Sequence, residues 1–596
     1  MTLSGPFGYA EWRNSENMVL LMLAASIHCC IGWRTWGESM SASNPILEFC
    51  EQTVAAAPEF AVGTKVVDGI EYPVFKNAPP SLHHLYAHAA ATFADLDFLV
   101  YHDERLTFAE TEARSLKLAS ALLAHGVEPG QPVAIAMRNF PEWVIAYMAI
   151  TRIGAVAVLM NAWWKTAELA YACEDSGAKL VFADQQRAER MGPIRESHGL
   201  QIVVARGSAD GATDWDAFIG GADASPAITP PSADDVGTIF YTSGSTGNPK
   251  GVLQTHQASI NTIMCWALLS TADRMVRGKG PAEGRQMGIL LAVPLFHVTG
   301  CNALFLLSVL AGQKLVMIDR WDVEHALECI EKEHLTAFNG VPSMSFELAE
   351  AAKTSDRDLS SLYAVSGGGA ARPAAHVPLI DEAIEHVMPS VGYGMTETSA
   401  LGTANAGAPY QDKPNSVGAG CFPLVTLRIV REDGSECETG EAGEIWIRSI
   451  ANMKGYLNQP EATAETLQDG YVKSGDVGYV DEDGDLFIVD RLKDIVIRGG
   501  ENISCQEVED ALYAHPQVKE AAAFGLPCEK LGEQLVAVVF AADPAPDQEA
   551  LQAFVKDRLA YYKVPVSIEV RNEPLPRGAT AKIYKRGLRE AALAAM

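Results

Sequence analysis

The sequence predicts an α/β protein with a large N-terminal domain of helix-covered parallel sheets, a β subdomain, and a small C-terminal α/β domain. Three observations support this fold class. Helical and strand-like apolar segments alternate from about residue 106, as in a parallel sheet covered by helices. After Ser416 this pattern gives way to short strands split by turns, and a second α/β pattern fills the last hundred residues. A chain of 596 residues is also too long for a single core.

The first alternating pattern joins amphipathic helices to short apolar strands. It comprises helices at residues 107–125, 141–153 and 166–176, and strands at 132–138, 155–160 and 179–183. A stretch rich in Pro, Ala and Asp at 222–235 predicts a joint. Further on, a loop rich in Gly and charge at 274–285 is expected before a strand at 287–293.

The later elements are shorter. Strands are predicted at residues 427–430, 444–447 and 486–489, with turns at Asp433-Gly434 and Asp483-Gly484. In the last hundred residues we expect helices at 507–514 and 551–559 and a strand at 535–540. The predicted division is therefore an N-terminal extension at 1–39, a large domain at 40–490 and a small domain at 491–596.

The first forty residues differ from the rest of the chain. Residues 18–33 are apolar, but they contain His28 and fall short of the about 20 residues that a membrane span requires. A signal peptide with Arg13 as its positive flank is the alternative, although no small-residue cleavage site clearly follows. We expect an upstream extension of a protein that starts at Met40. No integral membrane span is predicted, and peripheral membrane contact through this segment stays open.

Composition excludes several classes of function. The formal charge of -29 argues against sequence-independent nucleic-acid binding, which requires clusters of Lys and Arg to neutralise phosphates. The eleven cysteines are scattered without a C-x-x-C pair or a ligand-spaced cluster, so neither a zinc site nor a disulfide framework is indicated. A reducing, cytoplasmic location is expected. Any anionic ligand must be bound by local positive charge.

Such local charge lies in a loop that follows an apolar segment ending at Phe240. The run from Tyr241 to Gly251 reads YTSGSTGNPKG. It contains three glycines, Lys250, the hydroxyl of Tyr241 and four more hydroxyl side chains in the segment TSGST. Glycines let the backbone approach a ligand closely, while amide and hydroxyl groups donate to phosphoryl oxygens. It is not a Walker loop, because Pro249 precedes the lysine and Gly251 follows it. The run predicts a phosphate-binding loop of another kind.

The loop resembles the phosphate-binding signature of the adenylate-forming (AMP-binding) superfamily, of the acyl-CoA synthetase or fatty-acid–CoA ligase type. Further segments resemble the same family in the same order. They are PLFHVTG at 294–300, SGGGA at 366–370, VGYGMTET at 391–398, SGD at 474–476, DRLKD at 490–494, RGGENI at 498–503 and PRGATAKI at 576–583. The resemblance covers residues 60–590 and implies that the small domain is mobile.

The resemblance implies a site for ATP and for the AMP part of the intermediate. In this site Tyr393 stacks on adenine, Asp476 binds the ribose with help from Arg491, and Glu397 holds magnesium, with Ser245 as a second ligand. The complete set is Thr242, Ser243, Gly244, Ser245, Thr246, Gly247, Lys250, Gly368, Gly369, Ala370, Gly392, Tyr393, Gly394, Met395, Thr396, Asp476, Arg491 and Lys582.

The resemblance also assigns catalytic, hinge and coenzyme A roles. Lys582 is the expected catalytic lysine, although Ala581 stands before it where the family usually has glycine. His297 is expected to gate the acyl pocket, and Glu397 completes the catalytic set. Lys493 is the expected pivot between the domains. The expected CoA-binding loop consists of Arg498, Gly499, Gly500, Glu501 and Asn502.

Together these features predict an ATP-dependent carboxylate–CoA ligase that forms an acyl-adenylate and releases AMP and pyrophosphate. ATP, Mg²⁺ and coenzyme A are the expected cofactor and co-substrates. The dipeptide Phe296-His297 argues against an amino-acid substrate, because amino-acid-activating relatives place an aspartate there. The presence of Lys582 and Glu397 argues against a non-catalytic scaffold.

The sequence identifies the substrate acid less clearly than the reaction. Apolar segments that could line an acyl pocket are Trp163-Trp164, residues 258–269 with Trp266, and residues 303–310. They favour a medium- or long-chain fatty acid. An aromatic acid of the cinnamate or benzoate type and a fatty acyl-AMP ligase that loads a carrier protein are the alternatives. The oligomeric state, monomer or homodimer, stays open.

Overall fold

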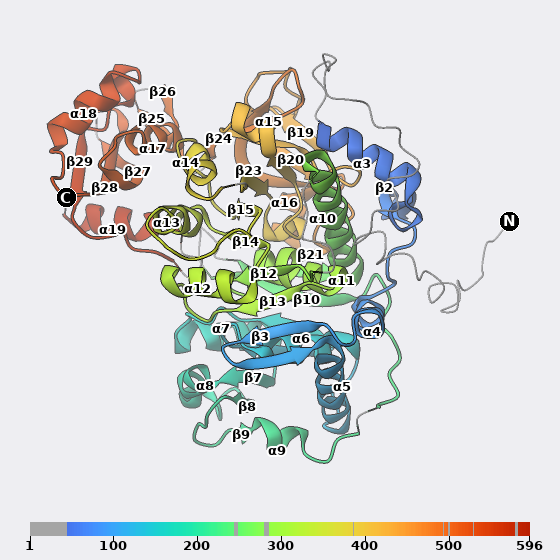
Figure 1. The fold of residues 1–596 in the computed structure, drawn as a ribbon. Coiled ribbons are helices and arrows are strands. Elements are labelled where there is room, and N and C mark those ends of the chain that lie inside the picture. The colour runs from blue at the N-terminus through green and yellow to red at the C-terminus, as the bar shows by residue number, and fades with distance from the viewer. Residues whose placement is uncertain are drawn as a thin grey trace.

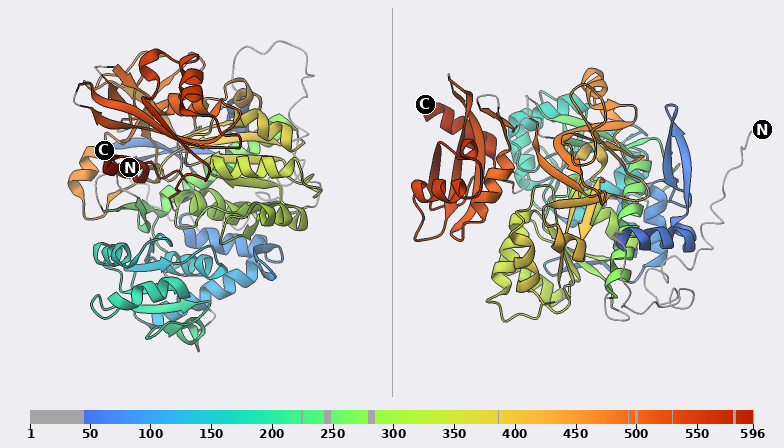
Figure 2. Two further views of the ribbon diagram at one scale, coloured as in Figure 1. Left: turned by 90° about the vertical axis from the view of Figure 1, so that its left-hand side faces the viewer. Right: turned by 90° about the horizontal axis from the view of Figure 1, so that it is seen from above.

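The computed structural model describes residues 45–223, 225–242, 248–278, 285–385, 387–492, 494–498, 501–528, 530–578 and 582–595. The N-terminal extension predicted at 1–39 lies outside the described residues. The described residues form two large sheets, a two-stranded ribbon and a separate C-terminal sheet (Figures 1 and 2). The predicted fold class, a large α/β domain followed by a small one, is confirmed.

The first large sheet has a parallel core in the order β10-β6-β5-β7-β8-β9, with β11 and β21 added antiparallel beside β10. Its central strands are buried on both faces, which explains their nearly continuous apolar sequences. The strands are β5 (Pro132–Ala136), β6 (Val156–Leu159), β7 (Leu180–Asp184), β8 (Gln201–Ala205), β9 (Thr213–Asp214), β10 (Val236–Thr242), β11 (Lys250–Thr255) and β21 (Gly455–Tyr456).

Helices connect these strands and separate the two sheets. A capping box between Thr107 and Glu110 begins α5, since each side chain accepts from the other residue's backbone N–H. Helix α6 is buried almost throughout because it contacts β5 and β6 of the first sheet and β3 of the second. The helices are α5 (Phe108–Ala124), α6 (Pro141–Arg152), α7 (Thr166–Ser176), α8 (Gln185–Met191), η3 (Gly192–Ile194) and α9 (Trp215–Ile219).

The second large sheet runs in the order β19-β20-β23-β24-β18-β17-β16-β15-β14-β12-β13-β3-β4, with β22 paired to β23. Strands β3 and β12–β16 are parallel, and the others pair antiparallel. The predicted β subdomain therefore continues the second sheet through the pairing of β18 with β24. Its strands are β3 (Asp97–Tyr101), β4 (Glu104–Thr107), β12 (Gly288–Leu291), β13 (Lys314–Met317), β14 (Ala337–Gly340), β15 (Ala364–Gly368), β16 (Met388–Tyr393), β17 (Thr403–Ala406), β18 (Ser416–Gly420), β19 (Thr426–Val430), β20 (Gly443–Arg448), β22 (Leu467–Gln468), β23 (Tyr471–Val480) and β24 (Leu486–Arg491).

Helix α10 (His256–Arg277) is longer than the sequence suggested, since residues 274–277 continue the helix instead of forming a loop. It ends where Gly278 adopts a left-handed conformation with φ 60°. Helix α3 (Pro45–Ala56) lies beside it (Figure 1). The remaining elements are η2 (Pro58–Phe60), β1 (Val62–Val67), β2 (Ile70–Phe75), α4 (Leu82–Thr92), the π-helix η4 (Thr299–Leu306), α11 (Leu307–Ala311), α12 (Val323–Glu333), α13 (Pro342–Ala352), α14 (His376–Ala383), η5 (Thr396–Thr398), α15 (Gly407–Asp412) and α16 (Pro460–Thr466).

The C-terminal sheet has the order β26-β25-β28-β27, with β29 parallel to β28, and it has its own apolar cores. It stands to one side of the large domain (Figure 2). Its elements are β25 (Val496–Arg498), β26 (Glu501–Ile503), α17 (Cys505–Tyr513), β27 (Val518–Cys528), β28 (Gly532–Ala541), α18 (Gln548–Lys556), η6 (Tyr561–Lys563), β29 (Ser567–Arg571) and α19 (Lys585–Ala595). The division at residue 490 stays a prediction.

Contacts between the two domains are polar and aromatic. The Arg577 guanidinium donates to Ser343 Oγ at 2.8 Å, and the rings of His376 and Tyr513 meet edge to face with centroids 5.7 Å apart. Both large-domain residues come from the region of α13 and α14, so this face of the large domain supports the small one. Within the described ranges, no helix is long and apolar enough to span a membrane.

Candidate active site

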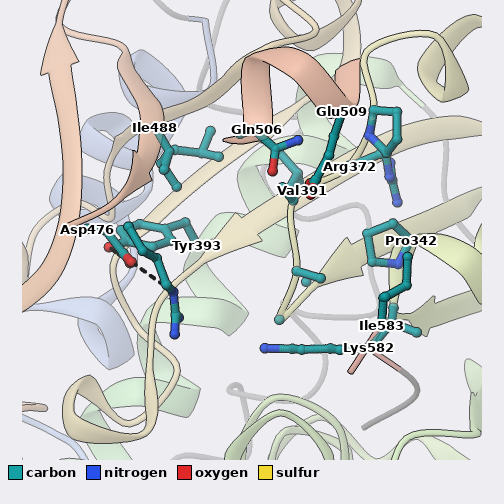
Figure 3. Close-up of a pocket in the computed structure, with 18 of the residues that line it drawn as sticks. Pro342, Arg372, Val391, Tyr393, Asp476, Ile488, Gln506, Glu509, Lys582 and Ile583 are labelled. Carbon is teal, nitrogen blue, oxygen red and sulfur yellow. Dashed lines mark hydrogen bonds and ion pairs between the residues drawn. The ribbon is translucent and has the colours of Figure 1, made fainter. Parts of the chain in front are cut away.

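A cleft of about 2130 Å³ lies between the small domain and the ends of β15 and β16 (Figure 3). It gathers predicted residues from across the whole chain. Those that line it are Thr242, Lys250, His297, Gly368, Gly369, Ala370, Gly392, Tyr393, Gly394, Met395, Thr396, Glu397, Asp476, Arg491 and Lys582. The predicted loop residues Ser243, Gly244, Ser245, Thr246 and Gly247 lie outside the described residues. Their flanks, Thr242 and Lys250, are paired in the hairpin of β10 and β11 at the cleft.

Lys582 enters the cleft from the small domain, where its carbonyl accepts a hydrogen bond from the Gly578 N–H at 2.8 Å. Figure 3 shows its side chain extended into the open space of the cleft. A Cβ atom placed on Gly369 would lie 3.7 Å from Lys582 Cε, so the lysine passes close to this bare backbone. Burial and the nearby Arg491 charge lower the pKa of Lys582 to about 8, against an opposing effect of Asp476. The positive charge of the Lys582 ammonium is therefore not fully balanced by negative charges of the protein.

His297 lines the cleft just before η4. Burial, with a smaller contribution from the Lys582 charge, lowers the pKa of His297 to about 3. The imidazole is therefore neutral at physiological pH. Its Nε2 atom is buried and has no hydrogen-bond partner among the described residues. A neutral ring with an unpaired nitrogen can position a ligand, but it is a poor proton acceptor.

A polar group in the cleft consists of Tyr393, Asp476 and Arg491. The Tyr393 hydroxyl donates to Asp476 Oδ2 at 2.7 Å, and Arg491 Nε lies 3.1 Å from Asp476 Oδ1. Strands β23 and β24 position the pair, because Asp476 and Arg491 are register partners. Burial raises the pKa of Asp476, while the Arg491 guanidinium opposes this rise. The group offers a carboxylate held in place beside a flat aromatic ring.

Glu397 sits deep in the cleft at the start of the segment after β16. Its Oε1 atom accepts a hydrogen bond from the Tyr456 hydroxyl at 2.8 Å, and burial raises its pKa. Lys250 Nζ lies 4.7 Å above the ring of Tyr456. The buried carboxylate facing the cleft is a hard oxygen donor of the type that Mg²⁺ prefers, so the site fits this metal. Sequence reasoning missed Tyr456, for which a lone aromatic after Gly455 gives no signal.

Of the predicted hinge and CoA loop, Lys493, Gly499 and Gly500 lie outside the described residues. Arg498 donates to the carbonyl of Tyr562 at 2.7 Å, and Glu501 and Asn502 are exposed on β26. Among the described residues, none of this loop lines the cleft that contains Lys582.

The acyl pocket stays a prediction, because among the described residues none of the three apolar segments lines the cleft. Trp163 is 42% exposed under Arg138, and Trp164 packs in the core beside Tyr241. Most of the run 303–310 is buried, and none of its residues lines the cleft. Trp266 is different. A Cβ atom placed on Gly392, which does line the cleft, would lie 3.1 Å from Trp266 Cη2.

The comparison with protein families shows which family the chain belongs to. Residues 86–457 match the family model described as AMP-binding enzyme, and residues 507–582 match the AMP-binding enzyme C-terminal domain. The chain belongs to the AMP-binding enzyme family. Like its relatives, this AMP-binding enzyme is an AMP-forming acid–CoA ligase that works through an acyl-adenylate. The predicted family and enzyme class are confirmed.

Curated relatives act on different acids. A feruloyl-CoA synthase from Amycolatopsis sp is 36% identical over 81% of this chain and 93% of its own. A long-chain-fatty-acid–CoA ligase from Bacillus subtilis is 32% identical over 86% of this chain and 94% of its own. The solved o-succinylbenzoate CoA synthetase of Bacillus subtilis, in complex with its acyl-adenylate, has a TM-score of 0.73 and 31% identity, covering 85% of this AMP-binding enzyme and 97% of that chain. The same synthetase has been solved with ATP and a magnesium ion.

Proposed function

We propose that this ligase activates a compact apolar acid, with an aromatic acid favoured over a long-chain fatty acid. The observation that carries this proposal is the contact of Trp266 with Gly392. The Trp266 indole, a flat apolar ring, lies beside the strand that ends at Tyr393. A flat acid that starts near His297 and Lys582 would stack within this space, whereas a long chain would collide with the indole.

We propose that ATP binds with its adenine against Tyr393 and its ribose on Asp476, with Arg491 holding that carboxylate in place. Gly368, Gly369 and Ala370 form the other wall, where Gly369 has a φ of 77° that side chains disfavour. Lys250 and the loop before it face the β- and γ-phosphates. Thr396 lies at the α-phosphate. Magnesium, held by Glu397 and Ser245, would supply positive charge at the phosphate oxygens.

In the adenylation step the substrate carboxylate attacks the α-phosphorus and pyrophosphate leaves. We propose that Lys582 bridges the carboxylate and the α-phosphate, because it lines the cleft and its side chain passes beside Gly369. A fixed positive charge in a buried site stabilises charge that develops in a transition state far better than water does. Neutral His297 positions the acid and takes no proton in this scheme.

We propose that thioester formation uses a second arrangement of the small domain. Lys582 occupies the cleft in the described arrangement, while Arg498, Glu501 and Asn502 lie outside it. Rotation about Lys493 would withdraw the lysine and bring the loop of residues 498–502 to the acyl-adenylate. A few loop residues that change φ and ψ suffice for such a rotation. The CoA thiol would then attack the acyl carbonyl and release AMP.

A medium- or long-chain fatty acid is the second candidate. The long-chain-fatty-acid–CoA ligase among the relatives supports it. Transfer to a carrier protein instead of CoA remains the third alternative, and the loop of residues 498–502 argues for CoA.

The deciding experiment measures pyrophosphate release with a panel of acids, with and without CoA. The panel contains benzoate, cinnamate and ferulate together with straight-chain acids of increasing length. We expect the highest kcat/KM with an aromatic acid and an AMP-forming thioester product when CoA is present. A clear preference for acids with long alkyl chains would refute the proposed substrate class. Pyrophosphate release without any CoA thioester would favour a carrier protein as acceptor.

A further inference from the structure

We propose that Arg577 is a positioning residue that holds Lys582 in the cleft during adenylation, because it connects the chain beside Lys582 to both domains. Its two partners are Ser343 of the large domain and Glu520 of the small domain. Arg577, Ser343 and Glu520 all line the same cleft as Lys582. This inference rests on the proposed function, since it presupposes that Lys582 acts in adenylation and leaves the cleft for thioester formation.

Arg577 and Lys582 belong to two chain segments that are paired with each other. Arg577 and Ile583 form an isolated antiparallel bridge. Next to this bridge, the Gly578 N–H donates to the Lys582 carbonyl at 2.8 Å. Because these backbone contacts join the two segments directly, a displacement of Arg577 also displaces the backbone of Lys582.

The small domain binds Arg577 through Glu520 of β27. The Oε1 atom of Glu520 accepts a hydrogen bond from the Arg577 guanidinium, and its Oε2 atom accepts from the Leu575 N–H at 2.7 Å. Glu520 is only 8% exposed, and hydrogen bonds between a guanidinium and a carboxylate are stronger than neutral ones. Because Glu520 and Arg577 belong to the same domain, this contact would move together with Lys582 when the small domain rotates.

The large domain binds Arg577 through Ser343, the second residue of α13. The Arg577 Nη1 atom donates to Ser343 Oγ at 2.8 Å. Helix α13 packs against β15, the strand that leads to Gly369, where the Lys582 side chain passes. Figure 3 shows Pro342, the first residue of α13, on the side of the cleft from which Lys582 extends. The bond therefore connects the chain beside Lys582 to the wall along which the lysine lies.

The two contacts of Arg577 should behave differently during the reaction cycle. Rotation of the small domain would keep the bond to Glu520, but it would break the bond to Ser343, which crosses between the domains. The Ser343 contact is therefore specific to the arrangement with Lys582 in the cleft. Without this contact Lys582 should leave its position more often, and a misplaced catalytic group can lower a rate by about a hundredfold. The thioester step, for which Lys582 withdraws, should not depend on the contact.

The test measures the two half-reactions separately in Ser343→Ala and Arg577→Ala, with the acid that has the highest kcat/KM in the panel above. Adenylation is followed as pyrophosphate release in a single turnover without CoA, and thioester formation is followed from supplied acyl-adenylate and CoA. We expect Ser343→Ala to slow adenylation by about fivefold or more and Arg577→Ala to slow it further, with thioester formation within about twofold of wild type. In the Arg577→Ala background, Ser343→Ala should have no further effect, because the bond is already lost.

Two control variants accompany this comparison. Ser343→Thr keeps the hydroxyl that accepts from Arg577, so it should retain the wild-type rate of adenylation. Arg586→Ala removes a nearby arginine whose Nε donates to Glu590 within α19 at 2.8 Å, and it should leave both half-reactions unchanged.

Ser343→Asp tests the same contact in the opposite direction. A carboxylate at this position would form a charge-assisted bond with Arg577, and a negative charge is favourable in the first turn of a helix. We expect thioester formation from supplied acyl-adenylate to slow by about fivefold or more, because rotation must then break a stronger bond. In the Arg577→Ala background, Ser343→Asp should not slow this step, which separates the effect of the bond from that of the added charge.

Several results would overturn the role of Arg577. They are equal slowing of both half-reactions in Ser343→Ala, no slowing of either, additive effects in the double variant, or an unchanged thioester step in Ser343→Asp. A Lys582→Ala variant that still forms adenylate at the wild-type rate would instead overturn the proposed role of Lys582. A wild-type enzyme that releases no pyrophosphate with any acid would overturn the proposed function.

Discussion

The charge on Lys582 should control the alkaline side of the pH profile for adenylate formation. The pKa of this lysine is lowered to about 8, chiefly by burial and then by Arg491. The protonated fraction therefore falls about tenfold for each pH unit above 8. If only the ammonium form stabilises the transition state, kcat/KM for acyl-adenylate formation should be about tenfold lower at pH 9 than its plateau, and about a hundredfold lower at pH 10.

The assay is pyrophosphate release at low ATP, since kcat/KM reports the pKa of the free enzyme. Lys582→Arg is the control, because a guanidinium stays charged throughout this range and its residual activity should lose the alkaline decline. Lys582→Ala should abolish adenylate formation while sparing thioester formation from supplied acyl-adenylate. A wild-type profile that stays flat to pH 10, or an equal loss of both steps in Lys582→Ala, would refute the reasoning.

Three further predictions concern other parts of the cleft. Tyr456→Phe removes the hydroxyl that donates to Glu397, the proposed magnesium ligand, so the Mg²⁺ concentration for half-maximal pyrophosphate release should rise about tenfold or more. Gly394→Ala places a Cβ atom 2.8 Å from the carbonyl carbon of Ala400, so it should lower the free energy of unfolding by about 1–3 kcal/mol in denaturant titrations, whereas Gly192→Ala, which meets nothing within 4 Å, should not. His297→Gln should leave the acid side of the pH profile between 5 and 7 unchanged, because the imidazole, with a pKa of about 3, is already neutral there.

The fold, and the meeting of most predicted motif residues at one cleft, were predictable from the sequence. The strands at residues 132–138 and 179–183 and the helix at 166–176 lie within one or two residues of β5, β7 and α7. Their apolar runs and caps are local signals, so local reasoning reached them. The motifs that contain Lys250, His297 and Tyr393 are also short, contiguous segments. They could therefore be recognised in the sequence, and their order along the chain predicted that they meet at one cleft.

Features that depend on pairing across the chain were not predictable. Tyr456 reaches Glu397 because β21 pairs with the edge of β11. No local sequence pattern predicts this pairing. The acyl pocket stays a prediction for a similar reason, since apolar composition does not distinguish Trp164 in the core from Trp266 beside Gly392. Trp266 differs from Trp164 because its ring closely approaches Gly392, a glycine on another element.

The acidic composition of the chain determines how the cleft can bind an anion such as ATP. A protein with a formal charge of -29 repels ATP at a distance, so binding must come from charges fixed at short range. Lys250, Arg491 and Lys582 bring positive charges of this kind to the cleft. Desolvation in the cleft makes the unliganded Lys582 ammonium costly, and the lowered pKa of Lys582 reflects this cost. A polyphosphate beside Lys582 removes that cost, because an adjacent negative charge favours the protonated form. The site is therefore organised for the charge of the bound nucleotide, and the depressed pKa of Lys582 in its absence is the expected result of that organisation.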